Sequence, residues 1–240
     1  MSATRFRKQI NSILDRLRFE FDMFPSSDYQ PLPWLGKDRA RFRGGAVDRW
    51  NALEPLLKEL NVSSALDAGA NVGYFSIRMA RSDISTVAVE SDPRCYRSLL
   101  YAKNKLDVRN LAVLINHIDR STAQTLPTVD AVLFMSVWHN IIRETDLENA
   151  TDILRALWEK CRHVLVFESI EVGMKAHSRL PAMDPSPEEF FRRYLGDTCS
   201  GCIEIRRLGR FSGFEPYGPN DQRTLWAVIR ARDEGSCCQA

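Results

Sequence analysis

The chain has 240 residues, of which 44% are hydrophobic and 27% are charged, and its formal net charge is +2. This length allows one large domain with its own hydrophobic core, and the composition is that of a soluble globular protein. The small net charge does not indicate nucleic-acid binding, although a local basic patch stays open. No apolar run approaches the length of a membrane span, and the amino terminus lacks the apolar core of a secretion signal. We therefore expect a cytoplasmic protein without a membrane span.

The first 45 residues are expected to form an extension that precedes the main domain. Hydrophobic residues recur at three- and four-residue steps in residues 1–24, which predicts an amphipathic helix. This helix would pack on the main domain or on a second copy of the chain, giving a homodimer. A membrane-surface helix is the weaker alternative because its charges are mixed. Residues 25–45 contain prolines and a Gly-Gly pair and are expected to be a loop, whose cations include Arg43.

From residue 46 to residue 168 the pattern alternates between helices and strands. Helices are expected at 46–60, 73–81, 93–105 and about 146–161. Strands are expected at 64–68, 86–90, 111–115, 131–135 and 164–167. Pro55 is expected to kink or restart the first helix, whereas Pro93 stands where a helix tolerates proline. This alternation predicts a parallel sheet that binds its ligand at the carboxyl ends of the strands.

The pattern changes after residue 168. A loop is expected over 169–185, followed by a short helix at 188–195. Two further strands are expected at 203–211 and 223–230. Residues 232–240 are polar and are expected to be a disordered tail. The main domain is therefore expected to cover residues 46–231.

Residues 64–92 read SALDAGANVGYFSIRMARSDISTVAVESD. They predict a strand, a glycine-bounded turn, a helix and a second strand, with an acid at the end of each strand. Asp67 ends the first strand and Glu90 ends the second. Glu90 lies about 20 residues beyond the turn, which is the spacing at which a carboxylate reaches a ribose hydroxyl. This stretch predicts half of a nucleoside-cofactor site.

The turn Gly69-Ala70-Asn71-Val72-Gly73 narrows the choice of cofactor. A dinucleotide site has the motif G-x-G-x-x-G, and its middle glycine, which lets the backbone close on a pyrophosphate, is replaced here by Asn71. No Lys-Ser or Lys-Thr pair follows, which excludes a phosphate-binding P-loop. The turn suits a cofactor that has a ribose but no phosphate, and S-adenosylmethionine is such a cofactor. The alternative is an ordinary strand–helix–strand unit with a glycine-rich turn.

The segments DAGANVGYFS and VAVESDPRCYRSLLYAKN resemble the first two motifs of the class I S-adenosylmethionine-dependent methyltransferases, in particular the FkbM-type subgroup. The resemblance implies an α/β, doubly wound, Rossmann-like fold. Its mostly parallel seven-stranded sheet would end in an antiparallel last strand. It also implies an enzyme that transfers a methyl group to an O or N of a small molecule, such as a sugar or a glycolipid intermediate.

The same resemblance implies a cofactor site built from strand ends. Asp67 is expected to order the glycine turn and to accept from the methionine amino group, and Glu90 to accept from both ribose hydroxyls. An acid after the third strand commonly holds the adenine amino group, which assigns Asp119. The other expected cofactor contacts are Gly69, Ala70, Asn71, Gly73, Tyr74, Asp92, Met135 and Ser136.

The segment FMSVWHN, residues 134–140, departs from the FkbM pattern, which has an acidic residue and a glycine at this point. It looks more like the tRNA wobble-uridine carboxymethyl transferases. His139 is expected to face the acceptor and to act as a base, because an imidazole has an ordinary pKa of about 6.5. The alternative is that His139 only hydrogen-bonds a loop or stacks on the cofactor with Trp138. Residues expected to contact the acceptor are Arg43, Trp138, Arg207 and Arg223.

Three alternatives to a small-molecule methyltransferase stay open. One is a tRNA- or rRNA-modifying methyl- or carboxymethyl transferase, and another is a non-catalytic protein of this fold that binds a partner through its first helix. A nicotinamide oxidoreductase is disfavoured by the turn. Six cysteines are present, and Cys199-Ser-Gly-Cys202 is a lone C-x-x-C. Reduced thiols are favoured over a zinc or redox pair, and no metal site is expected.

Overall fold

A seven-stranded sheet organises the part of the chain that the computed structural model describes, which is residues 29–31, 33, 45–168, 170, 180–213 and 221–231. The strands are β1 (Ser64–Ala68), β2 (Ser85–Glu90), β3 (Leu111–Ile115), β4 (Val129–Met135), β5 (Cys161–Glu168), β6 (Cys202–Ser212) and β7 (Gln222–Arg230). Their order in the sheet is β3-β2-β1-β4-β5-β7-β6. The first five strands are parallel, and β7 is antiparallel to both β5 and β6. The predicted mostly parallel sheet with an antiparallel edge is confirmed.

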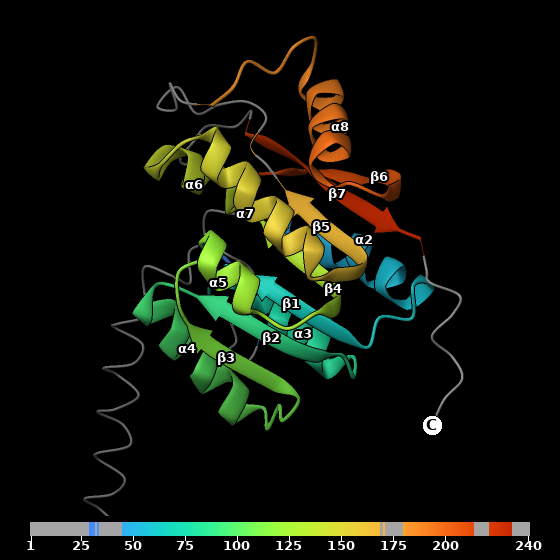
Figure 1. Ribbon diagram of the computed structural model, residues 1–240. Coiled ribbons are helices and arrows are strands. Elements are labelled where there is room, and N and C mark those ends of the chain that lie inside the picture. Colours follow the sequence, from blue (N-terminus) through green and yellow to red (C-terminus); the bar gives the residue numbers. More distant parts are fainter. Residues whose placement is uncertain are drawn as a thin grey trace, which may run out of the picture.

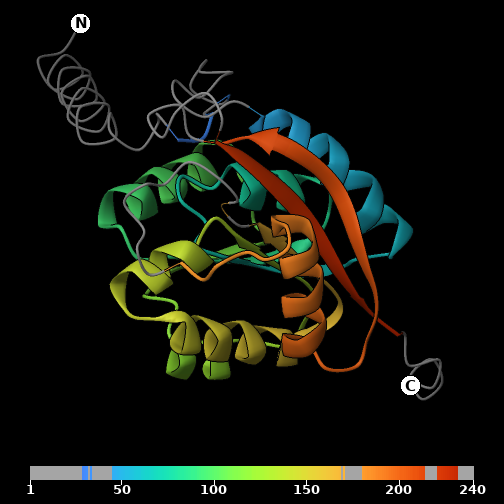
Figure 2. The same cartoon turned by 90° about the horizontal axis from the view of Figure 1, so that it is seen from above.

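Helices cover both faces of this sheet (Figures 1 and 2). They are α2 (Ala46–Glu59), α3 (Tyr74–Arg81), α4 (Pro93–Lys105), α5 (Arg120–Thr125), α6 (Trp138–Glu144), α7 (Leu147–Glu159) and α8 (Pro187–Thr198). The helices α2, α3 and α4 lie on one face, and α5 to α8 lie on the other. The molecule is therefore a three-layer α/β/α structure.

The alternation of side chains along β4 shows why both faces need helices. Val132 and Phe134 are buried with the residues of α7 and α8, whereas Ala131 and Leu133 are buried with those of α2 and α3. Successive side chains of a strand point to opposite faces, so an apolar strand such as β4 requires cover on both sides. All seven residues of β4 are buried. The sequence between Val129 and Met135 thus places this strand at the centre of the sheet.

Helix starts follow local signals in the sequence. Asp92 caps α4 by accepting from the backbone N–H of Arg94, and Pro93 is the first helical residue. The interpretation of Pro55 was wrong in one respect, because α2 continues through it as a single helix. The short helices α5 and α6 were not predicted. They have six and seven residues, too few for a hydrophobic period to be read.

Some predictions concern residues outside the described ranges. They are the helix over residues 1–24, most of the loop over 25–45 with Arg43, and the tail over 232–240. Within the described ranges, no helix is both long enough and apolar enough to cross a membrane.

Candidate active site

A cavity of about 480 Å³ opens at the carboxyl ends of the central strands. The chain leaves β1 toward β2 and β3 on one side, and β4 pairs with β1 on the other. Such a switch in direction leaves a crevice between the loops that follow the strands. Gly69 after β1, Glu90 at the end of β2, Asn116 after β3 and Met135 at the end of β4 all line the cavity. The predicted strand ends therefore meet at one place.

Glu90 is held in position by the backbone of its neighbours. Its Oε2 accepts from the N–H of Asn71 at 2.6 Å, and its Oε1 accepts from the N–H of Asp92 at 2.7 Å. Asn71 has a φ of 55°, in the left-handed region that asparagine tolerates better than most residues. Each carboxylate oxygen keeps a further lone pair, so Glu90 can accept two more hydrogen bonds. This geometry fits an acceptor for two adjacent hydroxyls.

Burial sets the charge state of the two acids that end β1 and β2. It raises the pKa of Glu90, while the amides of Asp92 and Asn71 act in the opposite direction. Burial also raises the pKa of Asp67 to about 6. The Asp67 carboxyl accepts from the hydroxyl of Ser76 in α3 and is not among the residues that line the cavity. Asp67 therefore orders the turn and its helix, and nothing in its contacts supports the predicted bond to a methionine amino group.

The glycines of the turn allow close packing. Gly69 has a φ of 86°, and a Cβ there would lie 2.4 Å from Val137 Cγ2. Gly73 has a φ of 85°, and a Cβ there would lie 2.0 Å from Leu99 Cδ1. A side chain at either position would be strained by the positive φ and would have to displace a neighbouring side chain. The glycines thus let the turn lie close to Val137, between β4 and α6, on one side and to Leu99 of α4 on the other.

Residues upstream of the main domain also reach this turn. Gly73 provides no side-chain cap for α3. The first N–H of that helix, from Tyr74, is instead bonded to Oε1 of Gln30 at 3.0 Å. Gln30 and its neighbour Tyr29 both line the cavity. The segment before α2 therefore forms part of the site.

The turn after β4 forms the wall of the cavity opposite Glu90. Ser136 has a φ of 61°, an unusual angle for a residue other than glycine. Its N–H donates to the backbone oxygen of Glu168 at 3.1 Å, and its hydroxyl donates to the Glu168 carboxylate. Arg223 Nη1 donates to the Ser136 hydroxyl at 2.9 Å. The neighbours at β5 and β7 thus fix Ser136 in this conformation.

Two buried ion pairs lie behind this wall of the cavity. The guanidinium of Arg49 in α2 contacts the carboxylate of Glu168, and both side chains are 0% exposed. Arg223 Nη2 donates to Asp221 Oδ2 at 3.2 Å, and both of these side chains are 1% exposed. Buried charges are tolerated only when they are paired, and here two cations face two carboxylates.

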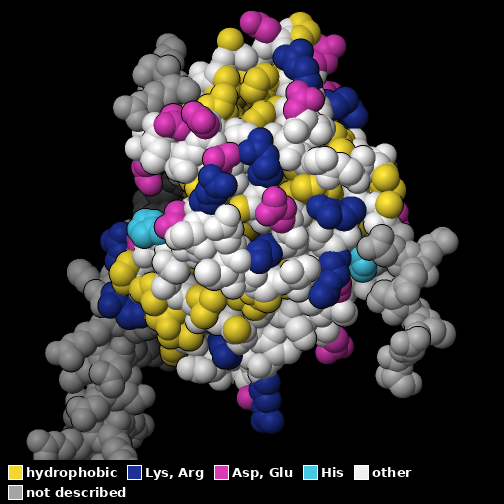
Figure 3. Space-filling model, in the orientation of Figure 1, with side chains coloured by type: hydrophobic (Ala, Val, Ile, Leu, Met, Phe, Trp, Pro, Cys, Tyr) yellow, Lys and Arg dark blue, Asp and Glu magenta, His cyan; other side chains and the backbone are white. Residues whose placement is uncertain are grey.

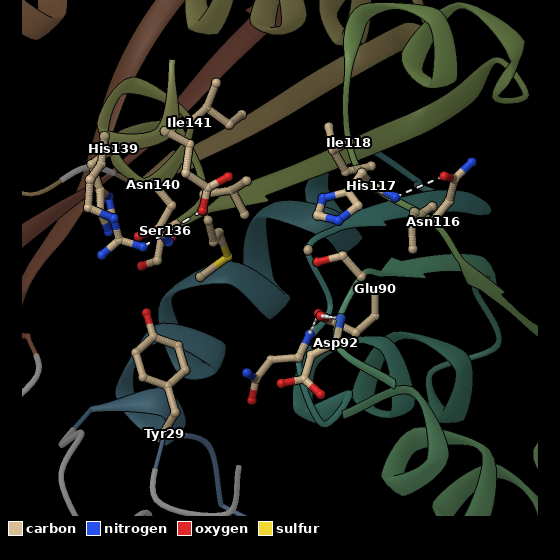
Figure 4. A pocket seen from close by; sticks show the side chains of 18 of the residues that line it. Tyr29, Glu90, Asp92, Asn116, His117, Ile118, Ser136, His139, Asn140 and Ile141 are labelled. Carbon is tan, nitrogen blue, oxygen red and sulfur yellow. Dashed lines mark hydrogen bonds and ion pairs between the residues drawn. The ribbon is translucent and has the colours of Figure 1, made fainter. Parts of the chain in front are cut away.

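Figure 4 shows how the two walls face each other. Ser136, His139 and Asn140 lie with Tyr29 on one side, and Glu90 and Asp92 lie with the segment Asn116–Ile118 on the other. His139 is in the first turn of α6 and is 3% exposed. The Asn140 side chain donates to the Ser136 backbone oxygen at 3.0 Å, which fixes the start of α6.

The cavity lining includes eight of the predicted site residues. They are Gly69, Asn71, Glu90, Asp92, Met135, Ser136, His139 and Arg223. Ala70, Gly73 and Tyr74 lie in the turn or just after it without lining the cavity, so they support its shape from behind.

Trp138 does not lie where acceptor binding would need it. It is 0% exposed, its indole N–H donates to the Tyr194 hydroxyl at 2.9 Å, and its ring packs on Phe167 and Phe191. The reason is that α6 begins at Trp138, so Trp138 and His139 point about 100° apart around the helix. His139 then lines the cavity and Trp138 enters the core.

Two more predicted residues lie away from the cavity. Arg207 is an exposed residue of β6, and its Nη1 pairs with Glu188 at 2.7 Å. Asp119 is exposed and caps α5 by accepting from the N–H of Thr122 at 2.7 Å. Asn116 and His117 line the cavity after β3 instead of Asp119.

Sequence reasoning missed several residues that line the cavity or support its wall. Glu168 ends β5, as Glu90 ends β2, and supports Ser136 from behind without lining the cavity, so the rule that ligands bind at strand ends would have drawn attention to it. The segment with Tyr29 and Gln30 carries no pattern that indicates a site. The other unpredicted polar lining residues are Ser91, Asn116, His117, Asn140, Arg143 and Glu144.

Cysteine and metal predictions can be examined within the described residues. Cys199 and Cys202 are free thiols, and burial raises the pKa of Cys199 above its ordinary value. A raised pKa makes a thiol less reactive. Among the described residues, no group of three or more His, Cys, Asp or Glu side chains is arranged to hold a metal ion.

The residues of the cavity fit a nucleoside cofactor such as S-adenosylmethionine. Asn71 Oδ1 is buried and has no hydrogen-bond partner among the described residues, so it can accept from a ligand. The Glu90 carboxylate is oriented for vicinal hydroxyls, and Gly69 leaves space that a side chain would fill.

Neither a model of a known protein family nor a curated protein sequence matches this chain. Solved structures do match its fold. The bifunctional kinase-methyltransferase WbdD aligns with 84% of this chain and 43% of its own, at a TM-score of 0.66 and 18% identity. This chain therefore spans less than half the length of WbdD.

The N-terminal domain of EvdMO1 is a second structural match. With SAH bound, it aligns with 90% of this chain and 97% of its own, at a TM-score of 0.61 and 16% identity. The same domain in the presence of SAH and D-fucose aligns with 91% of this chain, at a TM-score of 0.60 and 15% identity. At such identities the matches show the fold: this chain has the Rossmann-like fold found in the methyltransferase WbdD.

Proposed function

We propose that this protein is an S-adenosylmethionine-dependent methyltransferase that acts on an O or N of a small molecule, with sugars as the first class to test. One observation carries the proposal: the Glu90 carboxylate is preorganised by two backbone amides at the strand switch of a cavity of about 480 Å³. The structural match to the EvdMO1 domain with SAH bound supports the cofactor, and the crystal grown in the presence of D-fucose supports a sugar-related acceptor. The FkbM-type subgroup stays a prediction from the sequence.

The cofactor would be held by groups on both sides of the cavity. Glu90 would accept from the two ribose hydroxyls, and the buried Asn71 Oδ1 would accept from a donor nearby. Asn116 and His117 would border the base, and Met135 and Ser136 would border the sulfur. When bound, S-adenosylmethionine supplies an activated methyl group, so the task of the protein is mostly to position the acceptor.

His139 would take the proton from the acceptor. It lies on the wall opposite Glu90, at the start of a helix fixed by the bond between Asn140 and Ser136. A histidine imidazole is the side chain that most often accepts a proton in general base catalysis. His139 would therefore hold the acceptor hydroxyl or amine and receive its proton as the new bond to carbon forms.

Two arginines of β6 that could bind an RNA backbone are paired with carboxylates instead. Arg206 pairs with Glu59 and Glu204 at 3.0 and 2.8 Å. Arg207 pairs with Glu188. On the face seen in Figure 3, basic and acidic side chains are interspersed and do not gather into one basic surface. RNA binding through Arg206 and Arg207 would compete with these ion pairs.

The test is methyl transfer from S-adenosylmethionine carrying a labelled methyl group. The wild type and His139→Ala would be incubated with neutral sugars, sugar amines and tRNA in parallel. We expect label in a sugar or amine product, and a loss of kcat of about 10²- to 10⁴-fold in His139→Ala. The affinity of the variant for S-adenosylhomocysteine should stay within about twofold, because His139 would act on the acceptor.

Three outcomes would contradict parts of this proposal. Label in tRNA alone, together with tRNA binding that weakens strongly as the salt concentration rises, would favour the RNA alternative. Tight cofactor binding without transfer to any acceptor class would favour the non-catalytic alternative. Unchanged kcat in His139→Ala would remove His139 from the chemistry.

A further inference from the structure

Arg223 is a buried cation at the acceptor wall whose donors are already engaged. It is 1% exposed and lines the cavity. Its Nη1 donates to the Ser136 hydroxyl at 2.9 Å and to the Tyr29 hydroxyl at 3.2 Å. Its Nη2 donates to Asp221 at 3.2 Å. Three of the five N–H donors that a guanidinium carries are therefore bonded within the protein.

This arrangement is unlike a site for a phosphate or a carboxylate. Arginine recognises such anions by presenting two parallel N–H groups as a fork. In Arg223 both terminal nitrogens donate to protein oxygens, so the fork between Nη1 and Nη2 is occupied. The two remaining N–H groups are on Nη2 and on Nε, which is buried and has no hydrogen-bond partner among the described residues. Because the Asp221 carboxylate already accepts from Nη2 at 3.2 Å, it would repel an anion at this edge, whereas a neutral hydroxyl oxygen would not be repelled.

The charges around Arg223 also disfavour an anionic ligand. Asp221 faces it directly, and Glu168 stands between Ser136 and the cation of Arg49. The cavity lining itself carries three carboxylates, on Glu90, Asp92 and Glu144, against two guanidinium groups, on Arg143 and Arg223. Arg143 lies 3.9 Å from Glu144. Among the described residues of the lining, an incoming anion would thus meet three carboxylates and two guanidinium groups that already face carboxylates.

We propose that the compensated guanidinium of Arg223 makes the cavity selective for an acceptor that carries hydroxyls and no negative charge at its reacting end. This inference rests on the proposed function, and it narrows the acceptor class. Arg223 orients a neutral hydroxyl, and the carboxylate of Asp221 prevents the same cation from binding a phosphate. Asp221 is a specificity-determining residue that acts through Arg223.

The test measures the binding of inorganic phosphate by calorimetry, which requires no knowledge of the acceptor. The proteins are the wild type, Asp221→Asn and the double variant Asp221→Asn/Arg223→Met, each alone and saturated with S-adenosylhomocysteine. We expect no saturable phosphate binding by the wild type. Asp221→Asn should bind phosphate saturably, at least about tenfold more tightly than the weakest binding that the wild-type titration would detect, because a guanidinium in a low-dielectric site loses its compensating charge. The double variant should lose this gain.

Two further variants sharpen the result. Asp107→Asn is the matched control, since Asp107 also pairs with an arginine, Arg109, at 3.0 Å, but both side chains are exposed. It should gain no phosphate affinity, because solvent screens the released cation. Glu168→Gln removes the second buried carboxylate, so this variant should also gain affinity for phosphate. It therefore still tests the inference if Asp221→Asn does not fold.

Phosphate binding by the wild type would overturn the inference, and so would a folded Asp221→Asn and Glu168→Gln that both fail to gain affinity. The titrations of the protein without S-adenosylhomocysteine keep the inference separate from the proposed function. Failure of the wild type to bind S-adenosylhomocysteine would contradict the function, while the phosphate titrations would still report on Arg223 and Asp221.

Discussion

At the scale of single residues, the site depends on two acids that end adjacent strands but do different work. Glu90 lines the cavity, and its oxygens are oriented by amides of the turn and of α4. Asp67 is behind the turn, where it is 4% exposed and bonded to Ser76. A buried carboxylate that is not paired with a cation costs folding free energy when it is ionised. Asp67 therefore stabilises the turn at the expense of stability near neutral pH.

Asp67→Asn should change how stability depends on pH. The folded pKa of Asp67 is about 6 against an ordinary value of 3.8. Between these values the folded chain keeps a proton that the unfolded chain has released, so stability falls as pH rises from about 4 to about 6 and stays lower above it. Asparagine does not titrate. The loss between pH 4 and pH 7.5 should therefore shrink by about 1 to 3 kcal/mol in the variant.

Urea unfolding at a series of pH values measures this loss for the wild type and the variant. Asp107→Asn is the control, because Asp107 is exposed and its pKa is lowered by Arg109. If Asp67→Asn and wild type lose the same stability between pH 4 and pH 7.5, the buried acid is not the cause.

At the scale of elements, the glycine turn is fixed by the helices on either side of it. Gly73 begins α3 and packs against Leu99 of α4, which is 0% exposed. The side-chain oxygen of Gln30, from the segment before α2, accepts a hydrogen bond from the first N–H of α3. The turn is therefore held both by a close approach within the main domain and by a contact from outside it.

Gly73→Ala should destabilise the protein more than Gly201→Ala does. Both glycines have a positive φ, 85° at Gly73 and 76° at Gly201, so both variants incur a similar backbone cost of about 1 to 2 kcal/mol. A Cβ at Gly201 would meet no atom within 4 Å, whereas a Cβ at Gly73 would overlap the buried Leu99. Overpacking of this kind adds about 1 to 3 kcal/mol.

The midpoints of urea unfolding for the two variants give this difference directly. Equal midpoints would mean that Leu99 moves aside without cost, and the close approach would then play no part in holding the turn. Gly73→Ala should also weaken the binding of S-adenosylhomocysteine, because Asn71 and Gly69 belong to the same turn.

At the scale of the whole molecule, the sequence predicts the sheet well and half of the site. Strands such as Ser64–Ala68 and Leu111–Ile115 match their expected bounds, since apolar runs between turn residues are unambiguous. Strand ends meet in any parallel sheet, which is why Glu90 was found. Trp138 and Arg207 were misplaced because the start of α6 and the outer face of β6 depend on packing between distant segments. Tyr29 and Gln30 reach the cavity only through the tertiary fold.

The proposed function requires that the ends of β1, β2 and β4 together form a site for S-adenosylmethionine. The most direct measurement is calorimetric titration with S-adenosylhomocysteine of the wild type, Glu90→Ala and the surface control Asp107→Asn. We expect one site in the wild type and in Asp107→Asn. Glu90→Ala should bind at least about tenfold more weakly, because it loses two charge-assisted hydrogen bonds. No binding by the wild type would contradict the account, and equal affinity of Glu90→Ala would contradict the assignment of Glu90 to the ribose.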